Sequence, residues 1–214
     1  MNRTSSSTHD VVVVGARAAG AATAMLLARA GLDVLVVDRS RYGADTLSTH
    51  ALMRAGVVQL ERWGLLDDIV AAGTPAVRKT TFSFTANEMS VAIEPAHGVD
   101  ALYAPRRTVL DPLLVDAARD AGATVEYGTS ITDVTRDRSG RVNGVVGRDG
   151  DGRTVRHAAR WVVGADGLRS IVADAVDAPI ERQGTTVTAT VYGYWSDLET
   201  DGYQWCFRPA SQPA

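Results

Sequence analysis

The sequence has very little of the residues on which several classes of functional site depend. Cys206 is its only cysteine, which excludes a disulfide framework and a zinc site built from thiolates. Lys79 is its only lysine, and no glycine-rich loop precedes it, so the phosphate-binding loop of nucleoside triphosphatases is excluded and a Schiff-base enzyme is disfavoured. Because a single free cysteine suits a reducing compartment, we expect a cytoplasmic protein.

The sequence also has little net charge and few long apolar runs. The net charge of −3 over 214 residues predicts no nucleic-acid partner. The stretch 11–28 is nearly all apolar, but Gly15, Arg17 and Gly20 interrupt it, which favours a buried strand and helix over a membrane span. The four histidines are scattered without metal-ligand spacing, so we expect no metal site. A hydrophobic content of 45% is enough for a globular core.

A strand, a helix and a second strand follow one another near the start of the chain. Residues 10–14 form a β-branched run typical of a strand buried on both faces. Residues 18–30 indicate a helix of small residues that ends before Gly31, and 33–38 indicate the second strand. Such a unit predicts a right-handed crossover between parallel strands, as in nucleotide-binding α/β domains.

The spacing of apolar and turn residues predicts the rest of the fold. Helices are expected over 47–63, 65–71 and 108–121, and a hairpin outside the first sheet over 80–84 and 89–93. A strand at 124–127 precedes a β-meander over 130–136, 141–148 and 153–159. Residues 160–164 are expected to form one more buried strand, and 185–195 and 203–208 strands of another sheet.

The turn after the first strand carries a dinucleotide-binding pattern. Gly15 permits a tight turn, Gly20 lets helix and strand pack closely, and the helix start offers N–H groups to a pyrophosphate. The predicted contacts with the phosphates come from Gly15, Ala16, Arg17, Ala19 and Gly20. Arg17 replaces the usual second glycine, so its Cβ keeps the backbone further from phosphate, although its guanidinium can pair with it. Asp38 ends the second strand, where a carboxylate accepts a hydrogen bond from a ribose hydroxyl.

A second motif, Gly164-Ala165-Asp166-Gly167-Leu168-Arg169-Ser170, follows a strand and opens a helix. Together with the first motif it resembles the flavoprotein monooxygenases of the p-hydroxybenzoate hydroxylase fold. The resemblance implies FAD as cofactor and assigns further cofactor contacts to Arg39, Arg107 in Arg-Thr-Val-Leu-Asp, the backbone of Ile131, and the pair Asp166 and Gly167. The arginine that usually follows the Asp-Gly motif and a later Gly-Asp motif are both missing.

The resemblance also implies how the chain is divided. The expected fold class is α/β, with a Rossmann-like FAD-binding domain of parallel sheet and β-meander and an incomplete β-sheet substrate domain. The FAD-binding domain is assigned to 1–78 and 98–178, the hairpin 79–97 to the substrate domain, and 179–214 to its start. Because the later Gly-Asp motif of this family is missing, we expect the chain to be the N-terminal fragment of a longer enzyme.

In function, the resemblance implies an NAD(P)H-dependent flavin monooxygenase. Reduced FAD would react with O2 to a C4a-hydroperoxide that hydroxylates an aromatic or other electron-rich small molecule. A flavin-dependent reductase of isoprenoid double bonds, similar to geranylgeranyl reductases, and a non-catalytic nucleotide-binding fragment are the alternatives. The substrate, the choice between NADH and NADPH and the oligomeric state stay open.

Some side chains have two interpretations. His50 is a candidate proton carrier beside the flavin, or only a polar residue at a helix start. The aromatic residues of the strands either line a substrate pocket or form plain sheet core; they are Phe82, Phe84, Tyr192, Tyr194, Trp195 and Trp205.

Overall fold

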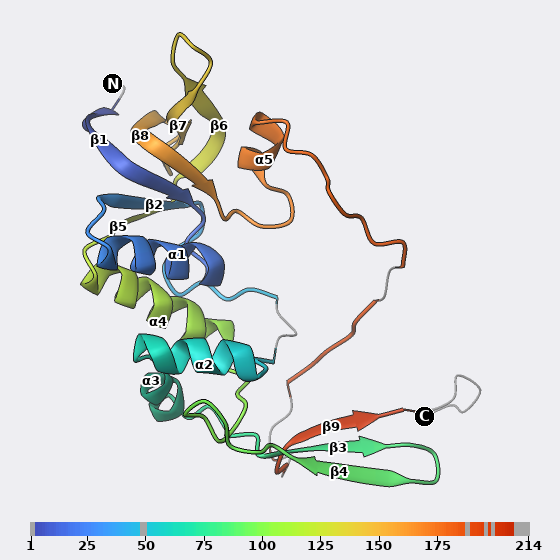
Figure 1. Ribbon diagram of the computed structural model, residues 1–214. Helices are drawn as coiled ribbons and strands as arrows, with labels where there is room; N and C mark the ends of the chain where they lie inside the picture. Colours follow the sequence, from blue (N-terminus) through green and yellow to red (C-terminus); the bar gives the residue numbers. More distant parts are fainter. Residues whose placement is uncertain (1–2, 48–50, 187–188, 195–196, 198–199, 208–214) are drawn as a thin grey trace. The chain divides into compact units, whose positions relative to one another are not determined.

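The computed structural model describes residues 3–47, 51–186, 189–194, 197 and 200–207. The chain divides into two compact units (Figure 1). The first unit comprises Met1–Thr46 and Arg107–Thr186, and the second comprises Leu47–Arg106 and Val187–Ala214. Each unit is therefore discontinuous in the sequence.

The first unit is built on a six-stranded sheet in the order β5-β2-β1-β8-β7-β6. Its strands are β1 (Arg3–Val14), β2 (Val34–Asp38), β5 (Thr124–Tyr127), β6 (Ser130–Arg136), β7 (Val142–Arg148) and β8 (Thr154–Gly164). β5, β2, β1 and β8 pair in parallel, whereas β7 is antiparallel to both β8 and β6. The predicted combination of a parallel sheet with a β-meander is confirmed.

The helices of the first unit cover this sheet. α1 (Ala18–Arg29) and α4 (Arg107–Asp120) pack against each other, and Figure 1 shows them on the same side of the parallel strands. The short α5 (Ile171–Ala175) contacts β6 and β8. The core consists mainly of β-branched side chains, since Val12, Val13, Val34 and Val37 are fully buried, as expected for strands covered on both faces.

The end of the meander differs from the prediction. The strands expected at 153–159 and 160–164 are one continuous strand, β8, which pairs with β7 through its first half and with β1 along most of its length. The prediction that the second half is buried is also wrong, because Trp161 is 64% exposed. Its ring lies 5.6 Å from the Arg141 guanidinium, so a cation–π contact on the surface explains an aromatic residue there.

The second unit combines two helices with a three-stranded sheet. α2 (Arg54–Trp63) and α3 (Leu66–Ala71) pack together, and β3 (Lys79–Ser83) lies between β4 (Glu88–Ala92) and β9 (Tyr203–Cys206). The hairpin β3–β4 belongs to this separate sheet, as predicted. α2 starts later than predicted, because Leu52 instead forms a β-bridge with Tyr103. In the predicted strand 185–195, the described residues have no regular secondary structure.

The boundaries of the compact units differ from those of the predicted domains. Residues 47–78 and 98–106 group with the hairpin, because backbone hydrogen bonds join them to one another. The Leu52 N–H donates to Tyr103 O at 2.8 Å, and the Val77 N–H donates to Leu102 O at 2.9 Å. Which unit serves cofactor and which serves substrate stays a prediction. No helix in the described part of the chain is both long and apolar enough to cross a membrane.

Candidate functional site

Three parallel strands of the first unit end at the same edge of the sheet. β1, β2 and β8 reach this edge at Val14, Asp38 and Gly164, which bring together three motifs that lie far apart in the sequence. The Gly15 N–H donates to Val37 O at 2.8 Å, and the Ala165 N–H donates to Val14 O at 2.8 Å. Ligands of open α/β sheets bind outside the carboxyl ends of the strands, so this edge is the candidate cofactor site.

The turn between β1 and α1 is packed too tightly for side chains. Gly15 has φ +105°, and a Cβ built on it would lie 2.4 Å from the carbonyl oxygen of Ala165. A Cβ on Gly20 would lie 1.8 Å from the carbonyl oxygen of Gly15. Both contacts are with backbone, which cannot move away at low cost. The two glycines thus hold the start of α1 against the turns that follow β1 and β8.

The start of α1 suits an anion. Its N-cap, Arg17, has extended backbone and makes no side-chain cap hydrogen bond, and the first turn of the helix holds no acidic residue. Ala19 in that turn is exposed. Uncapped N–H groups and the positive end of the helix dipole favour negative charge, so this helix start fits the diphosphate of FAD.

Asp38 has a structural task that the sequence did not reveal. Its carboxylate is buried and accepts a hydrogen bond from the Ala16 N–H at 2.7 Å through Oδ2. Oδ1 accepts from the Ser40 N–H at 2.7 Å and from Ser40 Oγ at 2.5 Å. A carboxylate has about four acceptor positions. Asp38 therefore orders the turn before α1, and its carboxylate has little acceptor capacity left for a hydrogen bond from a ribose hydroxyl.

Asp111 connects two arginines that the sequence assigned to the cofactor. Arg107 donates to it twice, from Nε at 2.7 Å and from Nη2 at 2.8 Å, and Arg17 donates from Nη1 at 3.3 Å. Asp111 itself is buried. In the sequence, Asp111 is only the last residue of the Arg107 motif, because no local pattern shows that Arg17 lies beside it. A small hollow here is lined by Ala16, Arg17, Ser40, Arg41, Gly43, Ala44, Asp111, Pro112 and Tyr127.

The Asp-Gly motif after β8 is engaged with its own chain. Asp166 Oδ1 accepts from Ser170 Oγ at 2.6 Å, and Oδ2 accepts from the Ile171 N–H at 2.7 Å. Ser170 Oγ in turn accepts from the Ala173 N–H at 3.0 Å, so Ser170 is the N-cap of α5. Gly167 is exposed with φ +90°. Asp166 shapes this turn, and a contact from the pair to the flavin stays a prediction.

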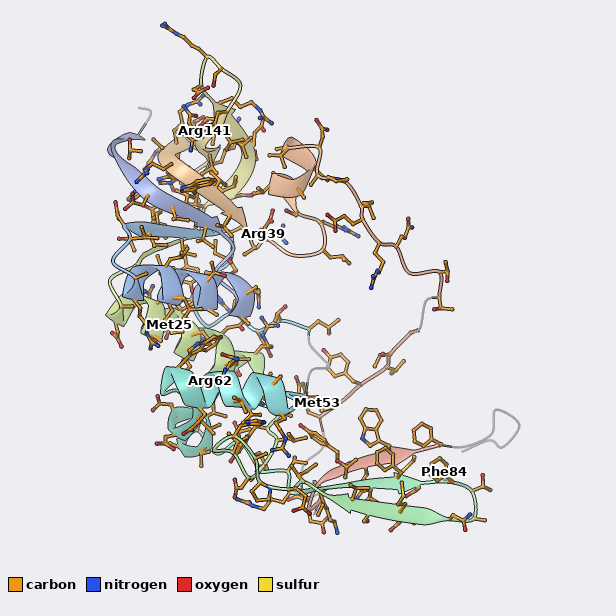
Figure 2. The ribbon with its side chains drawn as sticks, in the orientation of Figure 1. Met25, Arg39, Met53, Arg62, Phe84 and Arg141 are labelled. Carbon is orange, nitrogen blue, oxygen red and sulfur yellow. The ribbon has the colours of Figure 1, made fainter. Side chains whose placement is uncertain are left out.

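The remaining predicted residues have different surroundings. Arg39 follows β2 and is exposed, and Figure 2 labels it at that end of the sheet. The Ile131 side chain is buried in a cluster with Val14 and Val37, so only its backbone can contact a ligand. His50 lies outside the described residues. Among the described residues, no cluster of three or more histidine, cysteine, aspartate or glutamate side chains is arranged to hold a metal.

A group of polar aromatic contacts flanks the hollow. The Tyr42 hydroxyl donates to Asp116 Oδ2 at 2.5 Å, and this hydrogen bond, with burial, raises the pKa of Tyr42 to about 12. Burial also raises the pKa of Tyr127. The Arg119 guanidinium lies 5.1 Å from the Tyr42 ring centre and 5.8 Å from that of Tyr127. Both phenols therefore stay protonated at neutral pH.

Asp116→Asn should lower the pKa of Tyr42 from about 12 toward its ordinary value of 10.0, because the carboxylate no longer opposes ionisation. A raised pKa in the folded state contributes stability that is present below pH 10 and is lost as the pH rises through about 12. Phenolate absorbance titration of wild type, the variant and Tyr42→Phe measures the change. An unchanged titration in Asp116→Asn would contradict the assigned cause.

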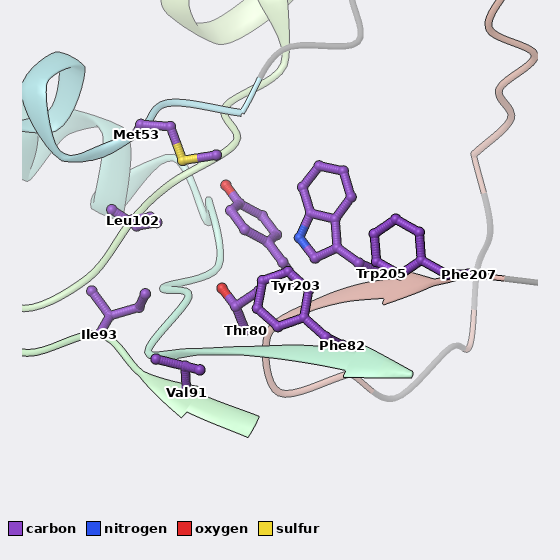
Figure 3. Close-up of a pocket in the computed structure, with 9 residues that line it drawn as sticks. All are labelled: Met53, Thr80, Phe82, Val91, Ile93, Leu102, Tyr203, Trp205 and Phe207. Carbon is purple, nitrogen blue, oxygen red and sulfur yellow. The ribbon is translucent and has the colours of Figure 1, made fainter. Parts of the chain in front are cut away.

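The second unit contains an apolar pocket of about 510 Å³ (Figure 3). Its lining consists of Met53, Thr80, Phe82, Val91, Ile93, Leu102, Tyr203, Trp205 and Phe207. Strand register explains the composition: Phe82 pairs with Met89 and Trp205, and Thr80 pairs with Val91 and Tyr203, so these side chains share one face of the sheet. The opposite face is polar, with a hydrogen bond between the Thr81 and Ser90 hydroxyls at 2.9 Å.

The aromatic residues named from the sequence separate into three groups. Phe82 and Trp205 line the pocket, whereas Phe84 stacks on Phe207 with ring centres 5.3 Å apart. Tyr192 and Tyr194 contact each other edge to face, and Trp195 lies outside the described residues. Sequence reasoning missed the other lining residues, which are Met53, Thr80, Val91, Ile93, Leu102, Tyr203 and Phe207. The period-two pattern of 203–207 was a signal for the last two, because it places them on the face of Trp205.

Comparison with known proteins agrees with this geometry. The model of a family described as FAD binding domain matches residues 8–205. Over 187 residues the chain is 36% identical to the menaquinone reductase of Mycolicibacterium smegmatis, covering 86% of this chain and 42% of that protein. Over 211 residues it is 31% identical to the aklavinone 12-hydroxylase RdmE of Streptomyces purpurascens, covering 90% of this chain and 39% of that protein.

A solved structure gives a similar result. The crystal structure of P. aeruginosa PqsL in complex with 2-aminobenzoylacetate aligns with a TM-score of 0.69 at 26% identity. The alignment covers 83% of this chain and 48% of that one. The chain thus spans less than half of the length of each of these three proteins.

Proposed function

Because the chain belongs to the FAD binding domain family of flavin-dependent oxidoreductases, we propose that its first unit holds FAD at the carboxyl ends of β1, β2 and β8. The observation that carries this proposal is the meeting of Gly15, Asp38 and Ala165 beside the uncapped start of α1. When bound, FAD supplies the two-electron chemistry of the oxidoreductase. The protein's share is to bind the diphosphate, orient the cofactor and hold substrate.

We propose a task for each residue at this edge. The N–H groups at the start of α1 bind the diphosphate, and Asp38 accepts a hydrogen bond from a ribose hydroxyl with its remaining capacity. Arg107, fixed by two hydrogen bonds to Asp111, contributes positive charge beside the phosphates. Arg39 and the Asp166–Gly167 turn complete the set, and the Ile131 backbone contacts the adenine.

For the reaction, we propose that NAD(P)H is the electron donor and that an apolar small molecule is reduced. Similarity to the menaquinone reductase favours reduction, and the apolar pocket of the second unit suits an apolar substrate. Hydroxylation with O2, which the sequence placed first, is the second candidate and is favoured by the similarity to the aklavinone 12-hydroxylase. The cytoplasmic location stays a prediction.

The cofactor proposal is tested by the visible absorption spectrum of the purified chain after incubation with FAD and desalting. We expect a retained flavin spectrum. A folded chain, as shown by circular dichroism, that retains no flavin would contradict the proposal that these residues hold FAD by themselves.

The two reactions differ in their need for oxygen. The FAD-loaded chain is mixed with NADH or NADPH and a naphthoquinone, with and without air. Reduction proceeds without air, whereas hydroxylation needs O2 and yields a product heavier by one oxygen atom. No reaction with either donor would leave FAD binding as the only function of the chain.

Arg17→Gly should weaken FAD binding about tenfold, the effect of losing one charge-assisted hydrogen bond. Asp111 is already held by Arg107 at 2.7 and 2.8 Å, so the longer 3.3 Å contact of Arg17 can be exchanged for a phosphate. Glycine is tolerated as an N-cap, which limits any effect on the helix. Titration with FAD measures the affinity, with the exposed Arg62→Gly as control. Tighter binding would instead show that closer backbone approach dominates.

A further inference from the structure

The hydroxyl group of Tyr203 is a polar group in a largely apolar pocket. Its oxygen is buried and has no hydrogen-bond partner in the part of the chain that the structure describes. Figure 3 shows the ring extending from β9 toward Met53, with the hydroxyl at its far end. A buried polar group without a partner is costly, so nearly all such groups in folded proteins are satisfied.

Several polar side chains on the opposite face of the same sheet are paired with one another. On the opposite face, Thr81 bonds Ser90 at 2.9 Å and Ser83 bonds Glu88 at 3.1 Å. The lining around Tyr203 is made of aromatic, aliphatic and methionine side chains, with the Thr80 hydroxyl and the Trp205 indole N–H as its only other hydrogen-bonding groups. A phenylalanine would fill the same space without the cost of the hydroxyl, which indicates that the hydroxyl has a partner outside the described part of the chain.

We infer that Tyr203 donates a hydrogen bond to an oxygen of a bound substrate, and that the pocket selects neutral, planar ring compounds that carry a carbonyl group. This inference rests on the proposed function, in which the pocket holds the substrate. Its volume of about 510 Å³ is suited to a small molecule with two or three rings. No charged side chain is among the lining residues, so an anionic substrate would be left without a counter-charge.

The direction of the hydrogen bond follows from the surroundings. Burial raises the pKa of Tyr203, which keeps the phenol protonated and able to donate. A carbonyl oxygen accepts this bond and brings no proton that needs an acceptor of its own. A ligand that carries a carbonyl gains this hydrogen bond on binding, whereas an analogue without the oxygen gains nothing from the hydroxyl.

The test compares menadione, a naphthoquinone, with methylnaphthalene, its oxygen-free counterpart, by equilibrium dialysis against the purified chain. Tyr203→Phe should weaken binding of menadione about fivefold and leave binding of methylnaphthalene unchanged. Tyr192→Phe, the same substitution outside the pocket lining, should affect neither compound. The melting temperature of Tyr203→Phe should be equal to or above that of wild type, because an unpaired buried group is removed.

The remaining outcomes separate the inference from the proposed function. Trp205→Ala should weaken both compounds, because it removes a wall of the pocket. If Trp205→Ala has this effect but Tyr203→Phe changes both compounds equally or neither, the role of Tyr203 is wrong while the pocket stands. If wild type binds neither compound, or Trp205→Ala changes neither, the substrate pocket and the role of Tyr203 are both overturned.

Discussion

Gly20→Ala is expected to abolish FAD retention and to lower the free energy of unfolding by about 3 kcal/mol, the upper end of overpacking costs. A Cβ at this position would lie 1.8 Å from the Gly15 carbonyl oxygen and 3.2 Å from the Ala165 Cβ. The turns after β1 and β8 cannot move away by themselves, because the Gly15 N–H donates to Val37 O and the Ala165 N–H donates to Val14 O. The substitution must therefore displace the start of α1, where the diphosphate is proposed to bind.

Urea unfolding and the absorption spectrum after desalting measure the two effects of Gly20→Ala. Gly150→Ala is the matched control, since Gly150 lies in the turn between β7 and β8 and its nearest contact would be 4.0 Å away. The control should keep the stability and flavin content of wild type. Retention of FAD by Gly20→Ala at wild-type level would show that the start of α1 does not bind the cofactor.

Asp38→Ala is expected to cost about 3 kcal/mol of stability and to weaken FAD binding by about 100-fold, since several donors lose a buried charged acceptor. The Ala16 N–H, the Ser40 N–H and the Ser40 hydroxyl all donate to this carboxylate. The turn before α1 loses its order when the Ala16 N–H is released, and the ribose loses its proposed acceptor in the same step.

Chemical unfolding and titration with FAD separate these two tasks of Asp38. Asp120→Ala, an exposed aspartate at the end of α4, serves as control and should leave both quantities unchanged. If Asp38→Ala loses stability but binds FAD with wild-type affinity, Asp38 only orders the turn and its assignment to the ribose is wrong.

The elements with strong local patterns were predicted well. The helix of small residues and the strand ending at Asp38 lie within a few residues of α1 and β2, and the β-branched run before Gly15 is the last part of β1, which begins earlier than predicted, at Arg3. Predictions were wrong where pairing partners far along the chain decide the structure. Leu52 pairs with Tyr103 instead of starting a helix, and β8 continues through Arg160 because β1 extends along it.

The candidate site shows the same division. Gly15, Gly20 and Asp38 are recognisable because their order along the chain reflects the turn that they form. Asp111 is not, because its contact with Arg17 arises only when α4 packs against α1. The Ile131 side chain likewise enters a core formed by other strands.

The sequence by itself determined the βαβ unit, the separate hairpin and the membership of a flavin-binding family, because these depend on local periodicity and on motifs of a few residues. Only the tertiary structure decided that Asp38 orders the turn before α1, that Asp111 joins two arginines, and that Tyr203 lies in an apolar pocket. The physical reason is that burial and hydrogen-bond partners at these positions come from strand register and helix packing, which unite segments that no local pattern connects.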